Sequence, residues 1–91
     1  MGAKAEISWR RLSDEGVRLQ VYAHHAGRQW RFFVRERRYD QWRALPEPPL
    51  QDWLELLDAV RRRINRRLLR PEEEECVKES ILQRFPEAEI R

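Results

Sequence analysis

The pattern of apolar and polar residues changes its period at about residue 50. Before that point, apolar side chains alternate with polar ones in three stretches, at about residues 6–11, 17–24 and 29–35. Alternation in stretches rich in β-branched and aromatic residues is typical of half-buried antiparallel strands. We therefore expect three strands between about residues 6 and 35, joined as a meander with the second strand in the centre.

The same alternation predicts a register, because the apolar side chains of paired strands must share one face of the sheet. We expect Trp9 to pair with Leu19, and Val21 to pair with Trp30. Each of the two loops that remain has a glycine near its end, where a positive φ costs little. These expected loops are Leu12–Gly16 and His24–Gly27.

After residue 50, apolar residues recur at the i, i+3, i+4, i+7 spacing of an amphipathic helix, and the opposite face begins with Asp52 and Glu55. Pro71, followed by Glu72–Glu75, indicates the start of a second helix, because proline suits the first turn and carboxylates favour the positive end of the helix dipole. We expect helices over about residues 50–69 and 71–84, the second burying Val77, Ile81, Leu82 and Phe85. The apolar stripe of the first is Leu50, Trp53, Leu54, Leu57, Val60, Ile64 and Leu68.

Residues 36–49 are expected to be a linker. Its first part could extend the third strand, but Asp40 ahead of Trp42 favours a capped helical turn. The prolines of 46–49 end regular structure. The expected fold class is therefore α+β: one domain over residues 1–91, with a three-stranded antiparallel meander followed by two helices packed on one face of the sheet. The expected core is Trp9, Trp30, Phe32, Trp53, Leu57 and Ile64.

Composition narrows the setting. No apolar run approaches the ~20 residues of a membrane span, and the first residues contain no hydrophobic signal region. Cys76 is the single cysteine, so it forms no internal disulfide. We therefore expect a cytoplasmic protein that does not associate with membranes.

Charge is distributed unevenly along the chain. The net charge is +3, but residues 1–45 hold ten basic and five acidic side chains, whereas residues 71–91 hold three basic and seven acidic ones. Of the 19 basic residues, 17 are arginine. Arginine suits bidentate contact with phosphate or carboxylate, although a GC-rich genome would give the same bias.

Little in the sequence favours catalysis. His24 and His25 are adjacent in an expected hairpin loop, so their side chains diverge, and Cys76 is far along the chain. There is no glycine-rich phosphate loop and no GxSxG motif. We expect no enzyme activity, no cofactor and no metal site.

One face of the expected sheet is the main candidate site, and we call it the arginine face. Guanidinium groups beside flat rings and side-chain amides are what nucleic-acid binding needs. The alternative is a solvated sheet surface, or one partly covered by the linker, with Tyr22 and Phe33 contacting Trp42. The arginine face comprises Arg10, Arg18, Tyr22, Arg31, Phe33 and Arg35 with Ser8, Gln20 and Gln29, and Arg37, Arg38 and Arg43 extend it.

A second basic patch is expected near the end of the first helix, at Arg62, Arg63, Arg66 and Arg67. It could meet a nucleic acid or an acidic partner, but cations at a helix C-terminus also complement the dipole, and Glu72–Glu75 follow closely. Arg61 falls inside the apolar stripe, where an unpaired charge is costly. We expect its guanidinium to reach Glu74.

Two hypotheses of function remain. In the first, a small basic domain binds nucleic acid through the arginine face. In the second, the protein is an interaction or regulatory module that binds an acidic protein partner without nucleic acid. Four tryptophans in 91 residues suit such an interface. We expect a monomer or a homodimer.

Overall fold

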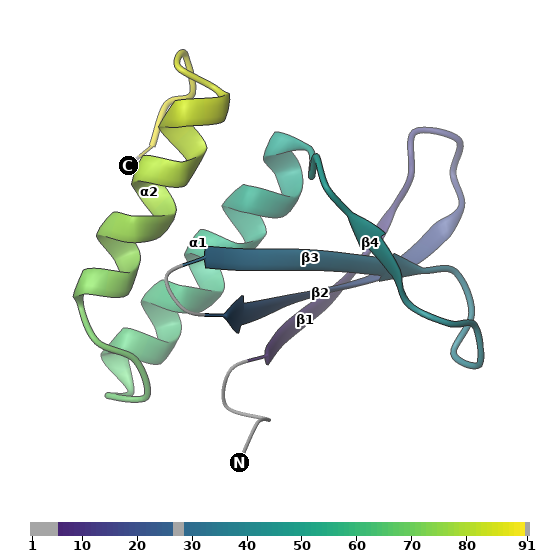
Figure 1. Ribbon diagram of the computed structural model, residues 1–91, viewed down its shortest axis with the longest axis horizontal. Helices are drawn as coiled ribbons and strands as arrows, with labels where there is room; N and C mark the ends of the chain where they lie inside the picture. The colour runs from purple at the N-terminus through teal and green to yellow at the C-terminus, as the bar shows by residue number, and fades with distance from the viewer. Residues whose placement is uncertain (1–5, 27–28, 91) are drawn as a thin grey trace. The chain divides into compact units, whose positions relative to one another are not determined.

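The computed structural model describes residues 6–26 and 29–90, which form four strands and two helices of the α+β class (Figure 1). The chain divides into two compact units, Met1–Glu47 and Pro48–Arg91, and each is described by itself. We call them the sheet unit and the helical unit. The expectation that the helices pack on one face of the sheet, in a single domain, stays a prediction.

The sheet unit is a single antiparallel sheet with its strands in chain order (Figure 1). The meander expected over residues 6–35 is confirmed, but the sheet has a fourth strand in what was expected to be linker. A strand of three residues is too short to show alternation, so the sequence pattern did not reveal it. The strands are β1 (Glu6–Leu12), β2 (Arg18–Ala26), β3 (Gln29–Arg35) and β4 (Arg43–Leu45).

The predicted registers were wrong by two residues in the first hairpin and by four in the second. Trp9 pairs with Val21 instead of Leu19, and Val21 pairs with Val34 instead of Trp30. Both shifts are even, so every side chain keeps its expected face. In the second hairpin β2 continues to Ala26, which pairs with Gln29, and the expected loop glycine Gly27 lies outside the described residues.

Turn chemistry explains the first shift. The Ser13 hydroxyl oxygen accepts hydrogen bonds from the N–H groups of Glu15 and Val17, and the Ser13 N–H donates to the Val17 carbonyl. Gly16 has a φ of +83°, which a glycine adopts without strain. The loop is therefore Ser13–Val17, and Leu12, expected in the loop, belongs to β1.

The expected capped helical turn at Asp40 is wrong. Asp40 instead closes a tight turn, because its Oδ2 accepts a hydrogen bond from the Arg37 N–H while its own N–H donates to the Arg37 carbonyl. This turn reverses the chain after β3, so that Ala44 of β4 pairs with Phe33.

The apolar face of the sheet is buried, as the alternation predicts. Val21 and Ala23 are fully buried in the central strand, and Phe32 is 3% exposed. Trp9, expected in the core, is only half-buried, and its ring meets Phe32 edge-on at 6.0 Å between centroids.

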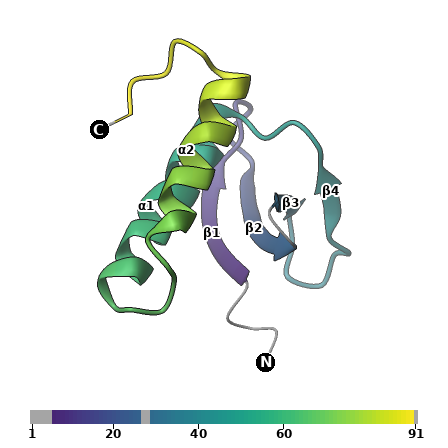
Figure 2. The same ribbon diagram turned by 60° about the vertical axis from the view of Figure 1, so that its left-hand side comes forward.

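The two helices lie side by side and run in opposite directions (Figure 1, Figure 2). They are α1 (Leu50–Asn65) and α2 (Glu72–Arg84). The predicted end of α1 at residue 69 was wrong, because Arg67 adopts a left-handed φ of 61°. Its N–H donates to the Ile64 carbonyl and the Leu68 N–H donates to the Arg63 carbonyl, which is a Schellman-type helix end.

The buried side of α1 is rotated from the predicted stripe. Trp53, Leu57 and Val60 are buried as expected, but Leu54 and Leu68 are exposed. The buried side of α1 includes Asp52 instead, which was expected on the polar face and is fully buried. Asp52 lies in the first turn, where the positive end of the helix dipole stabilises a carboxylate. The buried residues of α1 are Asp52, Trp53, Leu56, Leu57, Ala59 and Val60.

In α2, Val77 and Ile81 are buried as predicted. Leu82, also expected in the core, is 44% exposed. It follows Ile81 directly, so the 100° turn between neighbouring helical residues carries it away from the buried side.

Candidate nucleic-acid interface

The strand pairing brings the arginine face together in rows across the sheet. One row runs Arg10, Gln20, Arg35, and a second runs Ser8, Tyr22, Phe33. Arg31 pairs with His24, and Arg18 pairs with Leu12. Glu6, the acidic residue of β1 on the arginine face, is paired with His24 and not with an arginine. The arginines of this face in β1, β2 and β3 therefore lie opposite side chains that carry no negative charge.

Arg35 is held in place by three contacts within the sheet unit. Its Nε donates a hydrogen bond of 2.7 Å to Oε1 of Gln20, and its Nη1 donates one of 3.4 Å to the Asp40 carbonyl. Its guanidinium carbon lies 4.2 Å from the centre of the Trp42 ring, a cation–π geometry. Arg35 thus presents a positive charge in a fixed position.

The aromatic side chains of the arginine face form a cluster that Trp42 caps. Tyr22 and Phe33 are stacked, with 4.9 Å between ring centroids and 19° between planes. Trp42, from the segment before β4, meets Tyr22 edge-on at 4.6 Å. This is the partial cover by the linker that the sequence left open, and all three rings are half-buried.

The other arginines of this region reach solvent. Arg10, Arg18, Arg31 and Arg38 are exposed, and within residues 6–26 and 29–90 none of the four forms an ion pair. We call these four the sheet arginines. Arg37, predicted to extend the site, donates from Nη1 to the Tyr39 hydroxyl oxygen at 3.2 Å.

Sequence reasoning missed Tyr39. It sits in the turn after β3, and 79% of it is exposed, the largest fraction among the large hydrophobic residues that the structure describes. Its position directly after Arg37 and Arg38 was a signal that could have found it, since an aromatic beside basic residues suits nucleic-acid contact.

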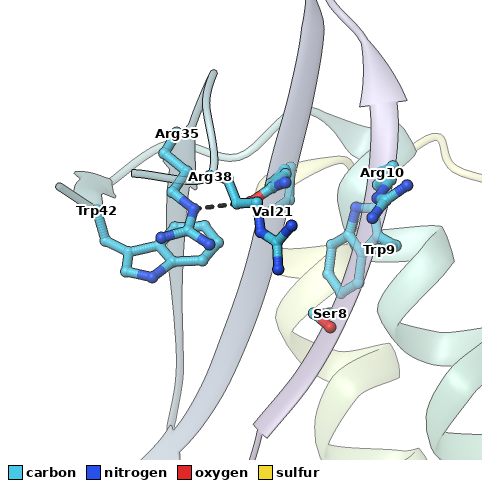
Figure 3. Close-up of a pocket in the computed structure, with 8 residues that line it drawn as sticks. Ser8, Trp9, Arg10, Val21, Arg35, Arg38 and Trp42 are labelled. Atoms are coloured by element: carbon cyan, nitrogen blue, oxygen red, sulfur yellow. Dashed lines mark hydrogen bonds between the residues drawn. The ribbon is translucent and has the colours of Figure 1, made fainter. Parts of the chain in front are cut away.

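Two pockets adjoin each other on the sheet unit. The first has a volume of about 510 Å³. The second has a volume of about 480 Å³ and is lined by residues that include Arg11, Arg18 and Glu36. Arg10 and Gln20 line both. The first pocket, shown in Figure 3, is lined by Ser8, Trp9, Arg10, Gln20, Val21, Arg35, Arg38 and Trp42.

The second basic patch has different surroundings. Arg62 forms an i, i+4 ion pair with Asp58. The predicted pairing of Arg61 with Glu74 is confirmed, because Nε donates to Oε2 at 2.9 Å. Lys78 adds an ion pair to the same carboxylate at 3.4 Å.

These contacts change the pKa of the Glu74 carboxyl group. The hydrogen bond from Arg61 lowers the pKa of its carboxyl below the ordinary value, with a further lowering from Lys78, against the opposing effect of burial. The remaining arginines of the patch are half-buried Arg63 and exposed Arg66 and Arg67.

The histidines lie in β2, so their expected location in a hairpin loop was wrong. Their side chains diverge all the same, because neighbouring strand residues point to opposite faces. His25 stacks on Trp30 at 4.6 Å, and Nδ1 of His24 is 3.9 Å from Oε2 of Glu6. Cys76 is exposed.

Two features of the described ranges bear on other functions. In them, no three His, Cys, Asp or Glu side chains gather so that they would hold a metal ion. No helix among these residues is both long enough and apolar enough to cross a membrane.

Comparison with known proteins gives no relative from which a function can be transferred. No protein-family model, no curated protein and no solved structure matches this chain.

Proposed function

We propose that the sheet unit binds nucleic acid, with phosphate groups held by the sheet arginines. The observation that supports this most is the exposure of four guanidinium groups that have no carboxylate partner in the described chain. Phosphates are the main source of affinity in nucleic-acid binding, and arginine matches them with paired N–H donors. The role is one of binding rather than catalysis, in a cytoplasmic protein without a cofactor.

The remaining residues of the site have distinct parts in this proposal. Arg35 adds fixed positive charge, because Gln20 and Trp42 already hold it. A base of a single strand stacks on Tyr39, which is more open than Tyr22 or Phe33. Tyr22 and Phe33 support the surface from below, and Arg37 orients Tyr39 through its hydroxyl.

A protein partner is the second candidate function, and exposed apolar side chains favour it. Leu12 is 57% exposed and Val17 is 39% exposed, at the hairpin next to Arg18. Apolar side chains beside arginine suit an acidic protein surface, or a second copy of this chain. In that case the protein would be a homodimer or a complex, and it would bind no nucleic acid.

A binding titration with duplex DNA, single-stranded DNA and RNA over a salt series tests the proposal. We expect the affinity to fall steeply with salt for each nucleic acid that binds. Arg31→Ala should reduce the log–log salt slope by about one unit, because one phosphate contact is lost. Tyr39→Ala should weaken single-strand binding by ~1–3 kcal/mol and leave duplex binding nearly unchanged.

Arg84→Ala is a matched control, because it removes one exposed arginine from the helical unit, where its guanidinium lies over the Trp53 ring. It should leave the salt slope unchanged. If Arg31→Ala behaves in the same way, the arginine face is a solvated surface and the protein-partner function takes precedence.

A further inference from the structure

The first pocket of the sheet unit combines three arginines from three different segments. Arg10 comes from β1, Arg35 from the end of β3, and Arg38 from the turn before β4. Figure 3 shows Trp42 and Arg35 on one side of this pocket and Arg10 and Trp9 on the other. None of the eight residues that line this pocket, all within the described ranges, is acidic.

Neutral polar groups complete the lining. Oε1 of Gln20 accepts the hydrogen bond from Arg35, which orients the Gln20 amide NH₂ group as a donor. Ser8 adds a hydroxyl that can donate or accept. Together with the guanidinium groups, these donors match a compact anion with several oxygen atoms.

We propose that this pocket binds a terminal phosphate monoester of a nucleic-acid strand, an inference that rests on the proposed function. An internal phosphodiester has a single negative charge, whereas a monoester has a charge of about −1.5 to −2 near neutral pH. Three positive charges without a carboxylate in the lining reward the second negative charge. Separate arginines along an open surface would not distinguish a terminal phosphate monoester from an internal phosphodiester.

The shape of the pocket supports an end of the strand rather than its middle. An internal phosphate has a sugar on each side, so it fits best on an open surface. The pocket has a volume of about 510 Å³, and Trp42 lies at one side of it. That volume is within the range of small-ligand sites and gives room for one terminal nucleotide with its phosphate. Arg18 and Arg31 lie outside the pocket and are available to the rest of the strand.

The test compares one short single-stranded DNA in three forms, with a 5′-phosphate, a 3′-phosphate, or hydroxyl groups at both ends. We expect at least one phosphorylated form to bind about 10- to 100-fold more tightly than the hydroxyl form. The stronger arm tells which end enters the pocket. The preference should shrink between about pH 7.5 and about pH 5.5, because the monoester loses its second charge below a pKa near 6.

Variants separate the pocket from the rest of the arginine face. Arg38→Ala and Arg10→Ala should remove most of the preference for the phosphorylated form. Arg38→Lys should retain part of it, because the charge stays while the paired N–H donors are lost. Arg31→Ala is the control: it should weaken binding of all three forms by a similar factor and leave their ratio unchanged.

The outcomes distinguish a failure of the terminal-phosphate site from a failure of the proposed nucleic-acid function. If all three forms bind equally, the terminal-phosphate site is refuted and the proposed nucleic-acid function stands. If no form binds, the proposed function fails and this inference fails with it. A phosphoserine peptide that binds while the oligonucleotides do not would overturn both in favour of a protein partner.

Discussion

The chain has two groups of arginines with the same chemistry, on a sheet and at the end of a helix, and their neighbours differ. The sheet arginines have no ion-pair partner in the described ranges, while Arg61 and Arg62 of α1 are each paired with a carboxylate. We call Arg62, Arg63, Arg66 and Arg67 the helix arginines. Four consecutive glutamates begin the next helix. Neighbouring carboxylates therefore distinguish the two groups at Arg61 and Arg62, whereas Arg63, Arg66 and Arg67 form no ion pair in the described ranges.

The secondary structure around each group explains the difference. On a helix, residues four apart are neighbours, so Asp58 reaches Arg62, and the α1–α2 hairpin brings Glu74 to Arg61. In a sheet, the neighbour of a side chain is its cross-strand partner. That partner is Gln20 for Arg10, Leu12 for Arg18 and His24 for Arg31.

The largest expected effect comes from removing one whole group. Replacing Arg10, Arg18, Arg31 and Arg38 with alanine should weaken nucleic-acid binding about 100-fold at low salt and reduce the log–log salt slope by about three to four units. The physical reason is that four phosphate contacts are lost together. The measurement is fluorescence anisotropy over a salt series.

The matched control removes the same charge from the other group. Replacing Arg62, Arg63, Arg66 and Arg67 with alanine changes the net charge equally, so long-range steering of the ligand is reduced by a similar amount. We expect the affinity to change by less than about threefold. Equal losses from the two variants would show that total charge, rather than the arginine face, governs binding.

A smaller effect is expected from breaking the compensation in the helical unit. Because the pKa of Glu74 is lowered, its ion pair with Arg61 stabilises the fold above the ordinary carboxyl pKa, and this contribution is lost as the pH falls through the lowered value. Glu74→Gln should therefore lower the free energy of unfolding by ~1 kcal/mol at neutral pH. Urea unfolding at several pH values should show the difference from the wild type shrinking under acid conditions.

Two further variants identify the cause. Glu72→Gln removes a charge from the same first turn of α2, so it controls for the helix dipole, and it should cost less than Glu74→Gln. Arg61→Leu should be tolerated, because it replaces a half-buried ion pair with apolar contact. A pH-independent loss in Glu74→Gln would contradict the ion-pair explanation.

Much of the fold could be predicted because alternation decides the face of each strand residue. Even register errors leave Arg10, Gln20 and Arg35 on the same face, so the members of the arginine face were predictable. The register itself was not, since it depends on the Ser13 hydroxyl closing a five-residue loop. A hydroxyl bonding to nearby backbone leaves no periodic signal in the sequence.

The detailed site was less predictable for a related reason. Trp42 and Arg35 meet because Asp40 reverses the chain through a side-chain bond to the Arg37 N–H. An Asp ahead of an apolar residue is equally typical of a helix cap, because helix caps and tight turns use the same hydrogen bond from a backbone N–H to the side chain. The sequence alone therefore favoured the capped helical turn. The immobilised Arg35 and exposed Tyr39 both follow from this turn.

The smallest expected effect concerns the end of α1, within the helix arginines. Arg67 has a left-handed φ of 61°, a conformation that costs a side chain with a Cβ atom ~1–2 kcal/mol. Glycine adopts it freely but loses more conformational entropy on folding, so Arg67→Gly should raise the free energy of unfolding by ~0.5–1 kcal/mol. Because the helix arginines do not hold the ligand in our proposal, nucleic-acid affinity should stay the same.

Arg66→Gly is the matched control: Arg66 has an ordinary φ of −91°, so the same substitution there should be neutral or destabilising. Chemical unfolding gives the stabilities, and a rise in both variants, or a loss of affinity in Arg67→Gly, would contradict the assignment of this cluster to a structural role.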